Sequence, residues 1–137
     1  GELIDRVTEL LAEPPWVGVA ARPAAVLAAA RGPDSRSREL AALDPPTPSA
    51  AVEAAHGSTG VELLLARALG AGWLDRYVGE WSRVALEISG EDLISAGVPE
   101  GPGVGRGLAA ALQAKLDGEA PTREDELRIA LDAARRP

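Results

Sequence analysis

The residues best suited to chemistry in this sequence are glycines and cations in its C-terminal half. Gly101, Gly103 and Gly105 alternate just before Arg106, and Lys115 follows further along. Glycine allows close approach of another backbone, and the unpaired N–H groups at a helix N-terminus favour an anion such as phosphate. Arg106 can add a fork-shaped charged contact. We therefore predict that these five residues contact a nucleic-acid backbone.

The surrounding pattern predicts two helices joined by a hairpin. Acidic residues after Gly90 suit the first turn of a short helix, and Gly97 is expected to end it. Pro99 and Pro102 restrict the turn, and a second helix is expected to begin near Val104. We predict a helix-hairpin-helix-like unit over residues 88–118. In the alternative interpretation, the glycines only make a compact helix connection and Arg106 is a solvated surface charge.

Catalytic groups are sparse. The sequence has no Cys, which excludes thiol catalysis and thiolate metal sites. Its single histidine, His56, lies near a predicted helix end and lacks a flanking nucleophile motif. The cluster at residues 124–126 follows Pro121 and Thr122, so we interpret it as the charged first turn of the last helix. We predict no catalytic residue, no metal ligand and no cofactor in this chain, and an independent enzyme is the least favoured reading.

The net charge of −7 opposes nucleic-acid binding, because Lys and Arg supply most of the affinity for phosphates. A local basic face can coexist with an acidic total, and several cations lie in the middle and later parts of the chain. Trp73, Tyr77 and Trp81 are spaced four apart, which favours a core stripe over a platform for stacked bases.

Proline and glycine divide the sequence into helical segments without a useful period-2 run, which predicts an all-α bundle of about eight short helices. Pro, Asp, Ser and Thr concentrate between residues 32 and 48. We therefore expect a first helical portion over residues 1–45 and a second over 46–137. The helices are expected at residues 2–12, 22–30, 37–43, 49–55, 61–69 and 73–86, in the hairpin pair, and at 124–134.

A longer stretch adds a resemblance. From Trp73 the sequence reads WLDRYVGEWSRVALEISGEDLISAGVPEGPGVGRGLAAALQAKLDGEAPTREDEL. It combines an Arg- and Trp-rich helix, a Ser-Gly-acidic-Asp-Leu start, a Gly-Val-Pro-x-Gly-Pro-x-Val-Gly turn and a Lys-Leu-Asp-Gly helix end. This run resembles the C-terminal body and tail of the bacterial tRNA nucleotidyltransferase (CCA-adding) and poly(A) polymerase superfamily.

The resemblance implies a non-catalytic part of a larger enzyme that positions tRNA for nucleotide addition at its 3′ end. Its partners would be tRNA or another RNA and the N-terminal catalytic portion of the same protein. That portion would use Mg²⁺ with CTP and ATP, held by a Gly-Ser pair and nearby aspartates. This sequence has a Gly-Ser pair only at Gly57 and Ser58, and no Asp-x-Asp pair follows it. The superfamily includes enzymes that add CCA, part of CCA, or poly(A), and the choice would belong to the catalytic head.

A second hypothesis makes the chain a helical protein–protein interaction or dimerisation module without RNA binding, on account of its alanine-rich faces and acidic last helix. No apolar run reaches the ~20 residues of a bilayer span, and the absence of Cys favours a cytoplasmic location. The sequence begins at Gly1 and has no Met, so we expect it to be a piece of a longer protein.

Overall fold

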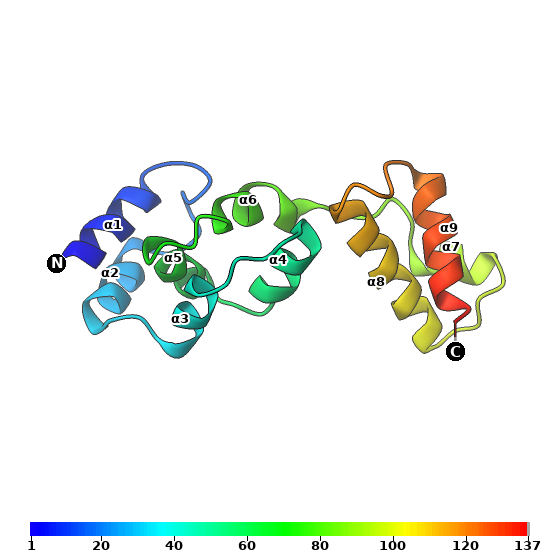
Figure 1. Ribbon diagram of the computed structural model, residues 1–137, viewed down its shortest axis with the longest axis horizontal. Coiled ribbons are helices and arrows are strands. Elements are labelled where there is room, and N and C mark those ends of the chain that lie inside the picture. The colour runs from blue at the N-terminus through cyan, green and yellow to red at the C-terminus, as the bar shows by residue number, and fades with distance from the viewer. Residues whose placement is uncertain (137) are drawn as a thin grey trace. The chain divides into compact units, whose positions relative to one another are not determined.

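The computed structural model describes residues 1–136, and this part of the chain is helical without a strand (Figure 1). It forms two compact units, unit 1 (Gly1–Arg83) and unit 2 (Val84–Pro137). The predicted all-α fold class is confirmed, with nine α-helices and one 3₁₀ helix within residues 1–136. None of these helices has the length and apolar character of a bilayer span.

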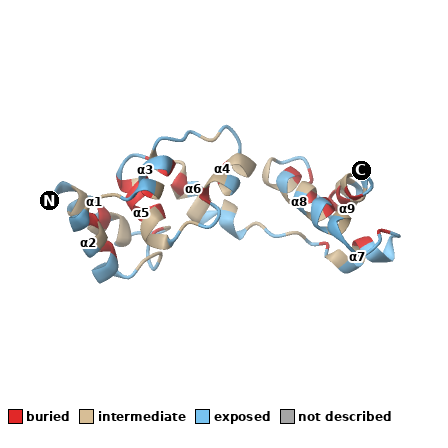
Figure 2. Cartoon of the chain, turned by 90° about the horizontal axis from the view of Figure 1, so that it is seen from below, coloured by how far each residue is buried: buried red, intermediate tan, exposed pale blue. Residues whose placement is uncertain are grey.

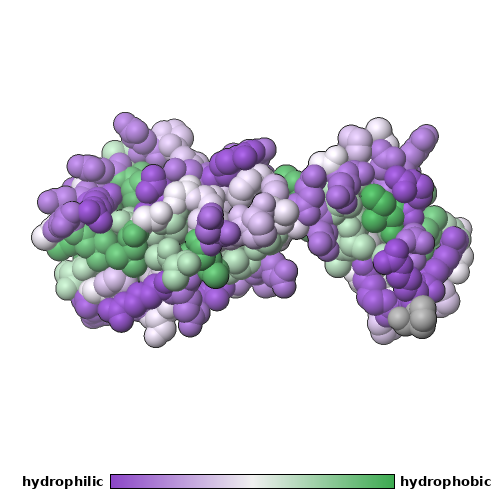
Figure 3. Space-filling model, viewed as in Figure 1, coloured by the Kyte–Doolittle hydropathy of each residue, from purple (hydrophilic) through white to green (hydrophobic). Residues whose placement is uncertain are grey.

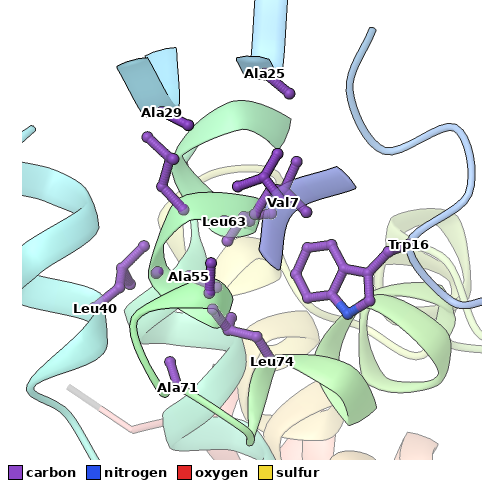
Figure 4. Packing of buried hydrophobic residues seen from close by; sticks show 13 residues of the cluster. Val7, Trp16, Ala25, Ala29, Leu40, Ala55, Leu63, Ala71 and Leu74 are labelled. Atoms are coloured by element: carbon purple, nitrogen blue, oxygen red, sulfur yellow. The ribbon is translucent and has the colours of Figure 1, made fainter. Parts of the chain in front are cut away.

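Unit 1 contains six α-helices around a core of mostly aliphatic side chains and Trp16. Figure 4 shows Val7 beside the Trp16 ring, with Leu63, Ala55 and Leu74 in the same cluster. Alanine lines much of this core, so the helices can pack closely. The helices are α1 (Glu2–Leu11), α2 (Arg22–Arg31), α3 (Ser35–Ala41), α4 (Pro48–Ala55), α5 (Gly60–Ala68) and α6 (Leu74–Gly79).

The helix predicted over residues 73–86 is shorter than expected. It ends at Gly79, and the 3₁₀ helix η1 (Trp81–Arg83) follows. Tyr77 packs against the unit 1 core, as does Trp73. Trp81 instead lies under the Arg76 guanidinium, 4.8 Å from the ring centroid, and is not part of that core cluster. The expected stripe of three aromatic residues therefore holds for two of them.

Unit 2 is built from α7 (Gly90–Ser95), α8 (Pro102–Leu116) and α9 (Arg123–Ala134). Helices α8 and α9 lie side by side and antiparallel (Figure 1). Each of the two helices carries both buried and exposed residues (Figure 2), as expected for helices that pack on one face. The core consists of Ile88, Leu93, Val98, Ala111, Ala130 and Ala134.

The predicted division at residues 45 and 46 lies inside unit 1. Helix α3 precedes this point, α5 follows it, and the two helices pack together. Arg36 of α3 also donates hydrogen bonds to the carbonyl oxygens of Ala54 and His56, at 2.7 and 3.2 Å, at the end of α4. The predicted hairpin unit, residues 88–118, falls within unit 2.

Candidate nucleic-acid interface

The hairpin between α7 and α8 is fixed by local backbone chemistry. The N–H of Ser89 donates to the Asp92 carboxylate at 2.8 Å. This hydrogen bond is the main cause that lowers the pKa of Asp92, and nearby Arg123 adds to the effect. Gly97 ends α7 with φ of 104°, as predicted, and Gly101 precedes α8 with φ of 141°. Both values lie in the region that favours glycine.

Helix α8 begins at Pro102, two residues before the predicted start at Val104. Proline suits this position because its fixed φ is already helical and its missing N–H would have had no partner in the helix. The first turn of α8 therefore includes Gly103 and Gly105.

The glycines of α8 differ in their surroundings. A Cβ on Gly107 would lie 2.6 Å from the carbonyl oxygen of Ala130, and one on Gly103 would lie 3.1 Å from that of Ala134. These two glycines, one helical turn apart, therefore allow α9 to pack closely against α8. A Cβ on Gly105 would meet nothing within 4 Å, and Gly105 is exposed.

Arg106 is exposed and lies at the end of α9. One guanidinium nitrogen, Nη2, donates to the carbonyl oxygen of Arg136 at 3.1 Å and approaches that of Ala134 at 3.5 Å. A cation at this position suits the partial negative charge of a helix C-terminus. Arg106 thus joins the start of α8 to the end of α9.

Lys115 has a structural partner. Its ammonium group donates to the Glu126 carboxylate at 3.0 Å and to the carbonyl oxygen of Ala85 at 2.7 Å. Its side chain is 26% exposed, whereas that of Glu126 is 1% exposed. Lys115, which was predicted to contact a nucleic-acid backbone, makes a contact that holds the start of unit 2 against α8 and α9.

Glu126 is the buried partner of Lys115 in this contact. Its carboxylate also accepts hydrogen bonds from the N–H groups of Glu87, at 2.8 Å, and Ile88, at 3.4 Å. Burial by itself would raise the pKa of Glu126, but the hydrogen bonds from Lys115 and the two N–H groups outweigh it and lower the pKa. Glu126 is therefore a charged, fully paired carboxylate in the interior of unit 2.

This role of Glu126 was not predicted from the sequence. The interpretation of residues 124–126 as a charged first turn describes Asp125, whose N–H donates to the Thr122 hydroxyl at 3.1 Å. A usable signal was present, because Glu126, Ala130 and Ala134 are spaced four apart and share one helix face. A carboxylate on the same helix face as buried alanines indicates a buried side chain that needs a cation or hydrogen-bond donor as its partner.

Outside the hairpin, a hollow of about 640 Å³ lies in unit 1. Asp75 on its wall accepts hydrogen bonds from the Trp16 indole at 2.7 Å and from Arg67 at 2.8 Å. Burial would raise the pKa of Asp75, but these two hydrogen bonds lower it. Within residues 1–136, no three His, Asp or Glu side chains converge as a metal site requires.

Comparison with known proteins gives one similarity to a curated protein. Over 62 residues, 45% of its length, the chain is 40% identical to an A-adding tRNA nucleotidyltransferase from Geobacter sulfurreducens. The aligned part spans 7% of that protein. No protein-family model and no solved structure matches the chain. The similarity supports a relationship to the tRNA nucleotidyltransferase superfamily.

Proposed function

We propose that this chain is a non-catalytic, RNA-binding C-terminal part of a tRNA nucleotidyltransferase or poly(A)-polymerase-like protein, and that unit 2 positions tRNA for 3′-end nucleotide addition. The similarity to an A-adding tRNA nucleotidyltransferase supports the choice of enzyme class. Nucleotide transfer, with Mg²⁺ and CTP or ATP, would belong to a catalytic portion of the parent protein.

One observation carries the proposed RNA contact. Gly105 lies in a helix, has no positive φ and leaves open space where a side chain would be. Glycine inside a helix costs about 1 kcal/mol relative to alanine, and the packing of unit 2 gives no compensation at this position. A close approach by a phosphate backbone is a physical reason for the absence of a side chain.

The neighbouring residues take different parts in the proposed contact. The N–H groups near Gly101 and Gly103 would face the phosphate, and the positive end of the helix dipole would favour its charge. Arg106 would donate from the guanidinium nitrogens that do not bond to α9. Lys115 would act indirectly, because its bond to Glu126 holds α8 and α9 in place.

Replacing Gly105 with Gln tests the proposal. Gln is a better helix former than Gly, so we expect the thermal stability of the variant to be equal or higher. The added side chain would block the bare surface, and we expect the affinity for a tRNA transcript to fall by about tenfold, or roughly 1.4 kcal/mol. Fluorescence anisotropy of labelled tRNA at low salt measures this change.

The matched control is Ala109→Gln, which adds the same side chain to an exposed position one turn further along α8. We expect it to change tRNA affinity by less than about twofold. Equal affinity of the wild-type and Gly105→Gln proteins would contradict the proposal, as would a wild-type chain that does not bind tRNA at low salt. A Lys115→Glu variant is unsuitable here, because it would place a second carboxylate beside buried Glu126.

A further inference from the structure

Charge is distributed unevenly along unit 2. This unit contains ten acidic residues and six basic ones. Seven of the acidic residues lie at the α8 end or near the α9 start: Glu87, Asp92, Asp117, Glu119, Glu124, Asp125 and Glu126. Glu91 follows Gly90, which packs against Val104 in the first turn of α8.

The opposite end of unit 2 is basic. The hairpin residues 97–101, the first turn of α8 and the last turn of α9 meet there; we call this region the hairpin end. It carries Arg106, Arg135 and Arg136, which are all exposed. Asp132 pairs with Arg136 at 2.5 Å, and Glu100 is a further acidic residue in this region.

The two ends are far enough apart to act separately. Helix α8 has 15 residues and is therefore about 22 Å long. The Debye length at physiological ionic strength is about 8 Å, so the acidic end is largely screened at the hairpin end. The negative total charge of the chain therefore does not cancel the attraction of the three arginines for a polyanion.

Arg135 is the arginine with the most freedom to bind. Within the described part of the chain, its side chain makes no ion pair or hydrogen bond, and it lies beside a hollow along α9 that Leu127, Leu131, Glu124 and Asp132 also line. The visible face of unit 2 is mostly hydrophilic (Figure 3), which suits a polar ligand better than an apolar one. An exposed arginine can donate two parallel hydrogen bonds to a phosphate.

We infer that Arg135 and Arg136, which follow the last turn of α9, form together with Arg106 of α8 the phosphate-binding edge along which an RNA backbone lies. This inference rests on the proposed function and extends it from the glycine-rich hairpin to the last turn of α9. The α9 turn and the hairpin are separated in sequence but joined by the bonds from Arg106 to the carbonyl oxygens of Ala134 and Arg136.

The test compares two double variants of the 137-residue chain that remove the same charge from α9. Arg135→Gln with Arg136→Gln removes both cations at the hairpin end. Arg123→Gln with Arg128→Gln removes two exposed cations from the first two turns of α9. Affinity for a tRNA transcript is measured over a range of salt concentrations.

We expect the hairpin-end double variant to bind about tenfold more weakly. The slope of log affinity against log salt is negative, and its magnitude should decrease by about 1.5, because two phosphate contacts are lost and each contributes about 0.7 to 0.9. We expect the control double variant to lose less than about twofold. Equal losses in the two double variants would overturn the inference, because total charge would then explain binding.

The Gly105→Gln variant in the same assay separates the two proposals. If it binds weakly while the hairpin-end double variant binds as the wild type does, the arginine edge is wrong and the hairpin contact stands. If neither change affects binding, both proposals fail.

Discussion

Replacing Gly107 with Ala is expected to destabilise unit 2 by about 2 kcal/mol, because the new Cβ would lie 2.6 Å from the Ala130 carbonyl oxygen. The same Cβ would lie 3.1 Å from Leu93 and 3.2 Å from Ala134, so its neighbours leave no space for the added methyl group. The helices must separate, which opens the contact between α8 and α9. For a unit of this size we expect the midpoint of thermal unfolding to fall by roughly 8 to 16 °C.

The distribution of aromatic residues makes this effect measurable. All three tryptophans, Trp16, Trp73 and Trp81, lie in unit 1. Tryptophan fluorescence therefore reports unit 1, while helical circular dichroism reports both units. We expect Gly107→Ala to shift part of the dichroism transition and leave the fluorescence transition in place. The control Gly105→Ala should be neutral or stabilising by up to about 1 kcal/mol. A Gly107→Ala protein as stable as the wild type would contradict the close packing.

Replacing Glu126 with Ala is expected to destabilise unit 2 by about 3 kcal/mol. The change leaves the Lys115 ammonium and the N–H groups of Glu87 and Ile88 without the carboxylate that pairs them. The control is Glu124→Ala, which removes the same charge from an exposed position in the same turn and should change stability by less than about 0.5 kcal/mol. Urea unfolding followed by circular dichroism measures both. Similar midpoints for the two variants would contradict the buried role of Glu126.

The same carboxylate predicts a dependence on pH. The folded protein holds the pKa of Glu126 below its ordinary value of 4.5, so folding favours the charged form. The resulting stability is fully present above the ordinary value and is lost as pH falls through the lowered pKa. In the variant Glu126→Gln this contribution is absent. We therefore expect the stability difference between wild type and Glu126→Gln to be largest near pH 7 and to shrink below about pH 4. A difference that does not change with pH would contradict the charged state.

Local signals in the sequence were sufficient for the fold class and most helix ends. Gly97 and Thr122 act through bonds within a few residues, which a reader of the sequence can infer from residue type. The end of α6 was missed because residues 80–86 include good helix formers, although the helix ends at Gly79, a weak helix former. Gly79 also packs against Pro15. Such a contact joins residues distant in sequence.

The candidate site was harder to predict for the same reason. Gly103, Gly105 and Gly107 look equivalent in the sequence, and only the position of α9 separates the two packed glycines from the exposed one. Lys115 looked like a surface cation, but its partner Glu126 lies in the next helix. The sequence could indicate which residue types a phosphate would need. It could not indicate which of them the packing already uses.

The separation of charge along unit 2 also affects how it would approach a polyanion. With acidic side chains at one end of α8 and arginines at the other, unit 2 has a permanent electric moment roughly along its helices. The field of a phosphate-rich surface exerts a torque on such a moment and turns the arginine end forward before contact. Pre-orientation of this kind raises the fraction of productive encounters and weakens as salt is added. In the proposed binding of RNA, the acidic residues at the far end would therefore help to orient the basic end, in addition to repelling misaligned approaches.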